Sequence, residues 1–393
     1  GTFTYRWLSS TDGINYSFTG ITDETYTPGV LYADTWFKRE VTATYLTRSC
    51  VKETNAVKVT VINFSPGSIG SDQTICEGTV PASFTSVAAS GDGTFTYSWE
   101  SSSTGTGGWV PLGVTTPAYS SPALSADTYF RRAVTATHGG TSCTLYTNTI
   151  LVKVNSFDAG TIGPPQTICE NTAPSELATV ISASADPAAT MTYQWQSSSD
   201  GTNYSSISGA TGENYTSGTL LTDTWFRRQV TVTLNGRTCT GLTPGVLIKV
   251  NNLSPGSIEG TQTVCEGEIP APFTETAAAV ADGTTVAYQW QESTDGSNFV
   301  NVAPGGNNAT YAPPAPLAGD TWFKRIVTST LDGVGCLKES NVIKVTVINF
   351  DPGSIAGDQS ICENSPAAPL TSVSPSGDGT FTYRWKMSTD GTD

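Results

Sequence analysis

The sequence of 393 residues has almost none of the groups from which catalytic and metal sites are built. It contains a single histidine, His138, in the segment His138-Gly139-Gly140. A catalytic triad or a histidine metal site needs this residue together with fixed partners. The motifs of serine hydrolases, zinc proteases and nucleotide-binding proteins are also absent. We therefore interpret His138 as a loop residue and expect no enzymatic activity, no cofactor and no bound metal.

Helical and membrane-spanning patterns are missing as well. No segment repeats apolar residues at helical spacing, and no apolar run approaches the roughly 18 residues that cross a bilayer. Basic residues are few, with 19 Lys and Arg against 34 Asp and Glu, for a net charge of −15. Nucleic acids require clustered positive charge. We expect an all-β chain of mutually repelling acidic domains, with no nucleic-acid partner and no membrane span in this sequence.

What the sequence does contain is one phrase, Tyr-x-Trp, repeated at intervals of 92, 96, 95 and 95 residues. Alternate side chains of a strand share a face, so each phrase places two large rings on one surface that must be buried. Removing a buried Trp costs about 3–5 kcal/mol. We predict that each phrase is the centre of one domain core; the phrases are Tyr5-Arg6-Trp7, Tyr97-Ser98-Trp99, Tyr193-Gln194-Trp195, Tyr288-Gln289-Trp290 and Tyr383-Arg384-Trp385.

The repeat period sets the domain boundaries. We predict a partial domain that lacks its first strands, three whole domains, and a final partial domain with first strands only: 1–63, 64–156, 157–251, 252–349 and 350–393. Gly1 to Trp7 and Gly379 to Trp385 are the same phrase, so we expect the sequence to be a segment of a longer array. Each whole repeat has about seven short strands, which favours tandem immunoglobulin-like or PKD-like β-sandwiches in an extended rod. A β-propeller is the alternative, but its blades need only about 40–50 residues.

A second repeated strand begins with Asp-Thr and continues as Trp/Tyr-Phe-Lys/Arg-Arg. Its period of two separates a face with Phe37, Arg39 and Val41 from a face with Trp36 and Lys38. The first face varies little between repeats, so we infer that it is buried. A buried guanidinium is best accommodated on an aromatic ring, where the contact contributes about 0.5–2 kcal/mol. We predict that the arginines stack on the core tryptophans, in the pairs Arg39 on Trp7, Arg132 on Trp99, Arg228 on Trp195 and Arg325 on Trp290.

Two binding alternatives use the same strand. A row of these arginines could bind an acidic glycan. The opposite face carries aromatic residues that could form a platform for a carbohydrate, although cross-strand packing is the simpler interpretation. These possible surface ligand contacts are Trp36, Tyr129, Trp225 and Trp322.

Turns and linkers separate the strands. A Ser-x-Asp-Gly phrase, as in Asp200-Gly201, predicts a hairpin turn; calcium binding by the Asp is a weaker alternative, because the spacing of a calcium loop is missing. The short linkers between repeats mostly contain Pro-Gly, which makes them stiff. Each linker also carries one apolar residue, which we expect to seal the joint between neighbours; these residues are Phe64, Phe157, Leu253 and Phe350.

The eight cysteines occur two per repeat and never as Cys-x-x-Cys. This pattern disfavours metal and predicts disulfides in an oxidising, extracytoplasmic setting. We favour pairing within a repeat, which requires the first cysteine to lie near the start of its domain: Cys76–Cys143, Cys169–Cys239 and Cys265–Cys336. Pairing across each junction, at a constant separation of 26 as in Cys50–Cys76, remains the alternative. It would require the intervening residues to fold back.

With its Ile-Cys-Glu entry, its Tyr-x-Trp run and its Asp-Thr-Trp/Tyr-Phe-Lys/Arg-Arg strand, the whole sequence resembles the tandem Ig-like/PKD-like repeats of large surface proteins of Bacteroidota. The best-known of these are SprB-like gliding-motility adhesins and related cargo of the type IX secretion system. The resemblance implies export through the outer membrane and display as long fibres.

These observations predict a non-catalytic extracellular stalk of a cell-surface adhesin, attached to the outer membrane, for gliding motility or surface attachment. Its expected partners are the neighbouring repeats of the same chain, with surface polysaccharide or other fibre chains as further candidates. Two alternatives remain open. One is an array of carbohydrate-binding modules attached to a secreted enzyme, and the other is a filament whose subunits complete each other's half-domains.

Overall fold

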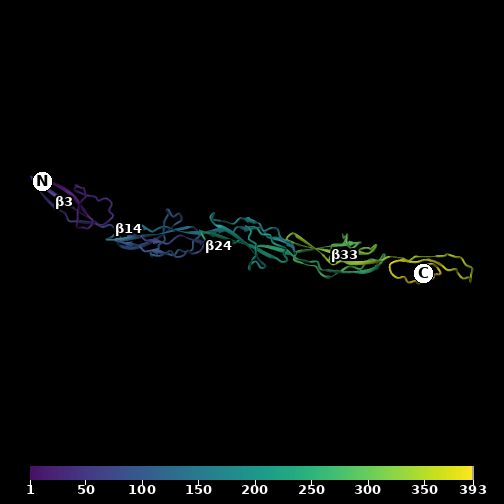
Figure 1. The fold of residues 1–393 in the computed structure, drawn as a ribbon. Coiled ribbons are helices and arrows are strands. Elements are labelled where there is room, and N and C mark those ends of the chain that lie inside the picture. The colour runs from purple at the N-terminus through teal and green to yellow at the C-terminus, as the bar shows by residue number, and fades with distance from the viewer. Residues whose placement is uncertain (392–393) are drawn as a thin grey trace. The chain divides into compact units, whose positions relative to one another are not determined.

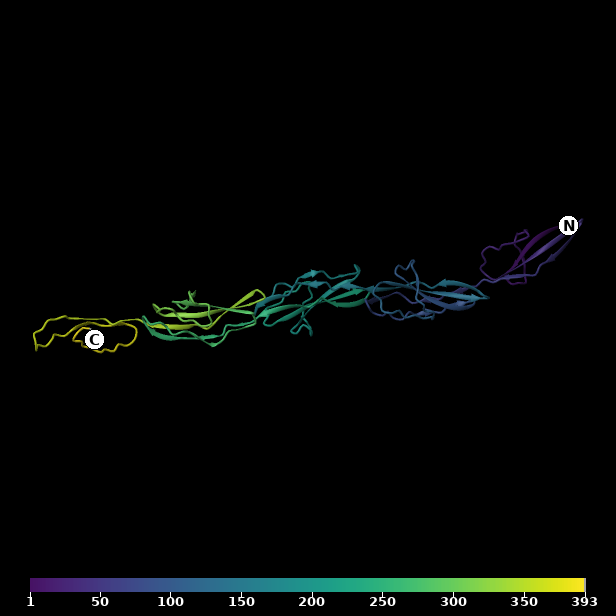
Figure 2. The same ribbon diagram turned by 180° about the vertical axis from the view of Figure 1, so that it is seen from behind.

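The computed structural model describes residues 1–391, and these residues form strands and connecting loops without a helix (Figure 1), as the view from behind also shows (Figure 2). It therefore confirms the all-β prediction. Within these residues nothing forms a helix long and apolar enough to cross a membrane. The chain divides into two compact units. The first comprises Gly1–Ala159, Ala183–Thr192 and Val230–Gly241, and the second comprises Gly160–Ser182, Tyr193–Gln229 and the residues from Leu242 onward. The third repeat thus contributes to both units.

The strands recur in the same order in each repeat. The first repeat contains β1 (Thr2–Ser10), β2 (Ser17–Phe18), β3 (Thr35–Tyr45), β4 (Arg48–Glu53) and β5 (Val57–Val59). The second contains β6 (Phe64–Ser65), β7 (Ser68–Ile69), β8 (Gln73–Cys76), β9 (Ser86–Val87), β10 (Ser90–Gly91), β11 (Thr94–Ser102), β12 (Val110–Pro111), β13 (Thr128–His138), β14 (Thr141–Tyr146) and β15 (Ile150–Asn155).

The third repeat contains β16 (Phe157–Asp158), β17 (Thr161–Ile162), β18 (Gln166–Cys169), β19 (Thr179–Ile181), β20 (Ser184–Ala185), β21 (Thr190–Ser198), β22 (Ser205–Ser206), β23 (Thr224–Leu234), β24 (Arg237–Leu242) and β25 (Val246–Asn251). The fourth contains β26 (Leu253–Ser254), β27 (Ser257–Glu259), β28 (Gln262–Cys265), β29 (Thr274–Ala277), β30 (Val280–Ala281), β31 (Thr285–Ser293), β32 (Val300–Asn301), β33 (Thr321–Leu331), β34 (Val334–Glu339) and β35 (Ile343–Ile348). The residues after them form β36 (Phe350–Asp351), β37 (Ser354–Ala356), β38 (Thr371–Val373) and β39 (Ser376–Gly377).

Each whole repeat is an immunoglobulin-like sandwich with one main sheet. In the second repeat its order is β12-β11-β13-β15-β8, and β14 also pairs with β13. All contacts in this sheet are antiparallel except that β8 runs parallel to β15. The short pairs β6 with β10 and β7 with β9 form the facing layer. The seven strands expected per repeat are therefore an underestimate, since the second repeat contains the ten strands β6 to β15, and β14 is among those that were not expected.

The tryptophans lie at the centre of the cores. Trp99, Trp195 and Trp290 are 0% exposed. Each indole donates a hydrogen bond to a loop carbonyl, such as that of Thr116 at 3.0 Å from Trp99. Each also packs against a tyrosine from the loop side, as Tyr119 does with ring centroids 5.5 Å apart from Trp99. Burial of a ring together with its polar N–H explains why the phrase recurs.

The Phe-Arg strand buries the face that alternation indicates. In β13, Phe130, Arg132 and Val134 are at most 2% exposed. The Arg132 guanidinium donates to the carbonyls of Pro117 at 2.7 Å, Pro66 at 3.1 Å and Val87 at 3.0 Å. The carbonyls of Pro66 and Val87 belong to the facing layer, and that of Pro117 belongs to the loop between β12 and β13, so one side chain ties the two layers together. Burial lowers the pKa of Arg132, but an arginine stays charged at neutral pH.

The prediction that these arginines stack on Trp was wrong about the main partner, which is the Tyr of the same phrase. Arg132 lies 4.9 Å from the ring centroid of Tyr97 and 5.9 Å from that of Trp99. The equivalent arginines also lie over the tyrosine of the phrase, with Tyr193 at 4.6 Å from Arg228 and Tyr288 at 4.7 Å from Arg325. The guanidinium turns toward the carbonyls at the edge of the core, and the tyrosine lies there, whereas the indole fills the interior.

The same carbonyls explain the Pro-Gly phrase of the linkers. Gly67 has φ +70°, and a Cβ at this position would lie 2.2 Å from the carbonyl oxygen of Val87. That oxygen is one of the acceptors of Arg132. A side chain at Gly67 would therefore displace the strand that the arginine holds.

The first repeat and the last segment lack part of this packing. Trp7 and its partner strand β3 are present in the first repeat, but the indole of Trp7 is only half-buried. Arg39 lies 4.6 Å from the ring centroid of Tyr5, 5.7 Å from that of Trp7, and donates to the carbonyl of Glu24. In the last segment Trp385 is 67% exposed. Among residues 1–391, the tryptophan of the phrase is therefore fully buried only in the three repeats that have both layers of the sandwich.

We predict that Arg132→Lys destabilises the second repeat by about 2–4 kcal/mol, because one ammonium cannot reach three carbonyls and unmet buried acceptors cost about 1–3 kcal/mol each. Hydrogen exchange of the amides in β13 measures this effect within the intact chain. Arg131→Lys is the matched control, since Arg131 is only partly buried and lies over Trp109. Equal protection in the two variants would contradict the proposed role of Arg132.

Candidate functional site at the junctions between repeats

Hydrogen bonds, ion pairs and disulfides meet where one repeat contacts the next. Strands β23 and β24 form a hairpin that reaches the end of the preceding repeat, and β33 and β34 do the same one repeat later. The receiving surface consists of the first and last strands of the preceding repeat. Their ends lie side by side, since Cys76 is in register with Asn155 and Cys169 with Asn251.

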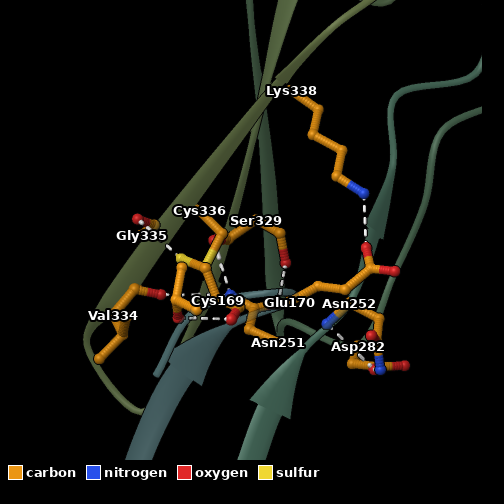
Figure 3. The surroundings of a disulfide bond; sticks show 11 residues. Cys169, Glu170, Asn251, Asn252, Asp282, Ser329, Val334, Gly335, Cys336 and Lys338 are labelled. Atoms are coloured by element: carbon orange, nitrogen blue, oxygen red, sulfur yellow. Dashed lines mark hydrogen bonds and ion pairs between the residues drawn. A yellow bond between two sulfur atoms is a disulfide. The ribbon is translucent and has the colours of Figure 1, made fainter. Parts of the chain in front are cut away.

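Two disulfides connect these surfaces. They are Cys76–Cys239, at a sequence separation of 163, and Cys169–Cys336, at a separation of 167. Each joins the first strand of one repeat to the hairpin of the next repeat, and Figure 3 shows the second of them, Cys169–Cys336. Both the favoured pairing within a repeat and the alternative across each junction were therefore wrong. Among residues 1–391 the cysteines without a disulfide are Cys50, Cys143, Cys265 and Cys362, all exposed.

Sheet geometry explains why Cys76 cannot bond to Cys143. Cys143 is in register with Ala136 near the far end of β13, whereas β13 pairs with β15 at its other end, through Phe130 and Ile150. From there β15 runs away to the level of Cys76. At about 3.3 Å per residue the two cysteines lie roughly 35 Å apart. A disulfide requires Cα atoms within about 7 Å.

The unbonded cysteines occupy the same places as the bonded ones. Cys143 lies in hairpin strand β14, as Cys239 does in β24, and Cys265 ends first strand β28, as Cys169 ends β18. The expected bonds of Cys143 and Cys265 are thus corrected: neither is bonded within its own repeat. Their counterparts would be a first-strand cysteine of the first repeat and a hairpin cysteine of the fifth, which the sequence does not contain.

A buried asparagine fastens each hairpin next to its disulfide. Asn251 is 0% exposed and donates to the carbonyls of Ser329 at 2.9 Å and Val334 at 3.2 Å. Its own carbonyl accepts from the Ser329 hydroxyl at 2.6 Å (Figure 3). The amide thus satisfies backbone groups on both strands of the hairpin, which specifies where the hairpin docks.

The preceding junction has an equivalent buried asparagine, but its side chain forms one hydrogen bond fewer. Asn155 is also 0% exposed and donates to the carbonyls of Val232 and Arg237 at 3.1 and 3.2 Å. Its carbonyl oxygen is buried and accepts no hydrogen bond from the described residues. Val232 stands where the fourth repeat has Ser329, so the hydroxyl donor is missing.

Ion pairs also connect neighbouring repeats at the surface of each junction. At the later junction Lys249 forms an ion pair with Asp332 at 2.9 Å. Lys338 forms another with Glu170. Asp332 raises the pKa of Lys249, and hydrogen bonds from Lys249 and Thr167 lower the pKa of Asp332. In the earlier junction Lys153 pairs with Asp186 at 2.9 Å. Exposed pairs of this kind contribute little stability, but they align the two surfaces.

The linker residues pack at the joints to different degrees. Leu253 is 3% exposed, and Phe64 lies 5.8 Å from Phe95 of the same repeat, measured between ring centroids. The ring of Phe157 lies against Gly241 of the hairpin, where a Cβ would come within 2.8 Å of it. Phe350 remains 48% exposed.

The candidate ligand-binding aromatics do not form an open platform. Trp36, Tyr129, Trp225 and Trp322 are all half-buried. The turn before each strand covers part of the ring, so that a Cβ on Gly201 would lie 3.0 Å from Trp225. Lysines also lie over the rings, as Lys344 does at 4.7 Å from Trp322. The aromatic face is therefore largely occupied by groups of the chain itself.

The remaining polar candidates have structural partners. Asp200 accepts hydrogen bonds from the backbone of Asn203 and Thr202 and from the hydroxyl of Ser198, and these bonds hold its pKa far below the usual range. Glu77, which follows Cys76, accepts a hydrogen bond from the hydroxyl of Ser156. His138 is the last residue of β13, adjoining the turn in which we expected it.

The hairpin strand itself is the element that our sequence interpretation missed. Its signal was present: Asn235-Gly236 and Asp332-Gly333 have the two-residue composition typical of tight hairpins. In the structure all four residues have positive φ, from +49° to +83°. Recognising these turns would have predicted strands β24 and β34. It would also have placed the second cysteine of each repeat in the hairpin, at the opposite end of the sheet from the first cysteine.

Peptide mapping without reduction tests the connectivity. We expect linked peptides containing Cys76 with Cys239 and Cys169 with Cys336, because only these pairs are in bonding geometry. A peptide that joins Cys169 to Cys239 would contradict the arrangement at both junctions. Alkylation of the native protein before digestion is the control, since it blocks exchange with the exposed free thiols.

A second prediction concerns the buried amide. Asn251→Leu should weaken docking of the β33–β34 hairpin by about 1–3 kcal/mol, since it leaves two carbonyls and a hydroxyl without their partner. Hydrogen exchange of the hairpin amides should become roughly 5- to 150-fold faster. The neighbouring Asn252→Ala is the matched control, because Asn252 is only half-buried and bonds to the exposed Asp282. The same increase in both variants would contradict the assigned role.

Comparison with known proteins gives one family and several structural likenesses. A family model described as "Domain of unknown function (DUF8696)" matches residues 1–63, 65–156, 158–252 and 254–349. No curated protein matches the chain. Among solved structures, it is similar to a crystal structure of three titin domains, with 13% identity over 73% of this chain and 100% of that chain and a TM-score of 0.28.

Two further structures are similar in the same way. An I-band fragment from titin has 7% identity over 72% of this chain and 96% of its own, with a TM-score of 0.36. Extracellular domains 3–5 of Drosophila OTK have 11% identity over 73% of this chain and 97% of their own, with a TM-score of 0.27. The four matched segments cover most of the sequence and correspond to its repeats, and the chain therefore belongs to the DUF8696 family, as a tandem array of its domains.

Proposed function

We propose that the chain is a non-catalytic extracellular stalk, in which successive sandwiches provide length and resist separation. The observation that carries this proposal is the junction, where a disulfide and a fully buried asparagine fasten each hairpin to the preceding repeat. Independent domains on flexible linkers would need neither. Disulfide-linked immunoglobulin-like domains also suggest an extracellular location, since reducing compartments do not maintain such bonds.

The distribution of polar groups supports the non-catalytic part of the proposal. Carboxylates at turns and strand ends bond to backbone, hydroxyl or lysine groups of the same chain, as Asp200 and Glu170 do. The buried arginines bind carbonyls inside each sandwich, so they offer no row of charges to an acidic glycan. The chain thus uses its charged groups to hold its own fold.

The wider role follows from the resemblance of the repeats to SprB-like surface proteins of Bacteroidota. We propose that the stalk belongs to a large adhesin that is exported to the cell surface, attached to the outer membrane, and used for attachment or gliding. Its partners would be the neighbouring repeats, with surface polysaccharide as a further candidate. An array of carbohydrate-binding modules is less well supported, because the aromatic face is largely covered by lysines and turns.

Small-angle X-ray scattering of the full chain tests the stalk. At roughly 35–45 Å per repeat, four domain equivalents should extend about 140–180 Å and give a radius of gyration of about 40–50 Å. A compact chain of this length would have a radius of gyration of about 21 Å. A value near the compact limit would contradict the proposal. The reduced chain is the control, and it should show a larger spread of conformations because the junctions are then fastened only by noncovalent contacts.

A further inference from the structure

The two disulfides interleave along the sequence. The first closes the segment from Cys76 to Cys239, and the second begins inside that segment, at Cys169, and closes at Cys336. The two closed segments overlap between Cys169 and Cys239. Neither bond can therefore be understood as the internal bond of one domain.

This order has a definite covalent topology. Three chain segments run between one bonded pair and the other: 93 residues from Cys76 to Cys169, 70 from Cys169 to Cys239, and 97 from Cys239 to Cys336. Each of the three segments begins at one disulfide and ends at the other. A force that pulls the two disulfides apart therefore acts on all three segments at once, side by side rather than one after another. The shortest segment becomes taut first.

We propose that the interleaved disulfides form an extension limiter. A force applied through the chain ends can separate Cys76 from Cys336 only by the length of the 70-residue segment, although these cysteines lie 260 residues apart in sequence. At about 3.3–3.6 Å per residue the limit is about 230–250 Å, against about 860–940 Å for an unbonded chain. The device is covalent, so it operates even after the repeats have unfolded.

The bonds also lie where a pulling force passes. Cys76 is in register with Asn155 at the end of the second repeat, and Cys169 with Asn251 at the end of the third. Force that reaches either linker is therefore shared with the adjacent disulfide. The segments that carry Trp99 and Trp290 remain slack when the 70-residue segment, which carries Trp195, is fully stretched. Because the ends of a slack segment stay close together, refolding that segment costs less chain entropy than refolding a fully stretched one.

Single-molecule force spectroscopy of the full chain, held at its two ends, tests the limiter. The exposed Cys50, Cys143, Cys265 and Cys362 are replaced by Ser in every version to prevent exchange. The intact protein is compared with the C76A/C239A variant, the C169A/C336A variant and the variant that lacks both bonds. Mass spectrometry verifies which bonds each version contains.

The expected result is strongly non-additive. Loss of the first bond lengthens the fully stretched chain by 23 residues, about 75–85 Å, and loss of the second by 27 residues, about 90–95 Å. Loss of both adds 190 residues, about 630–680 Å. The length is measured at full extension, so the result does not depend on whether a variant folds.

Dithiothreitol provides the matched measurement on the unaltered bonds. Each disulfide accepts two electrons and two protons from the reagent, which closes to its cyclic disulfide, and the intact version should then gain the full 190 residues. Increments that simply add, or a length unchanged by reduction, would overturn the proposal. The outcome is separate from the stalk function, because a chain that is compact in scattering could still show this covalent limit.

Discussion

The length of the Phe-Arg strand is the constraint on which the rest of the structure depends. At eleven residues, strands such as β23 and β33 are longer than one sandwich core needs. The first half pairs with the last strand and buries the core, and the second half forms the hairpin that docks on the preceding repeat. One strand therefore serves both the interior of its own domain and the joint with its neighbour, so stability and connection cannot be altered independently.

Within each sandwich the buried arginine connects the two layers. Arg132, Arg228 and Arg325 are 0% exposed, and each donates to carbonyl groups of surrounding loops. A guanidinium suits this position because it offers several donors in one plane and stacks on the neighbouring tyrosine. The glycine of the linker is part of the same arrangement, since only a residue without a side chain permits the close approach of Gly67 to Val87.

Much of the fold could be predicted from local sequence pattern, because buried and exposed side chains alternate at every second residue of a strand. Alternation identified the buried Phe-Arg-Val face, and the Tyr-x-Trp phrase marked the cores. The ring over which the arginine lies could not be predicted, since it depends on carbonyls from distant loops such as Pro66 and Val87. The disulfides could not be predicted because spacing carries no information on which end of a sheet a cysteine occupies. The missed turn at Asn235-Gly236 would have supplied it.

The docked hairpin has a practical consequence for how this protein can be divided. A single repeat excised at its linkers would leave its first-strand thiol and its hairpin thiol both unpaired, and would uncover the amide of Asn155 or Asn251 to water. The smallest fragment that retains a native crosslink must join the opening strand of one repeat to the hairpin of the next. The unit of covalent integrity is therefore an overlapping pair of repeats, offset from the unit of sequence.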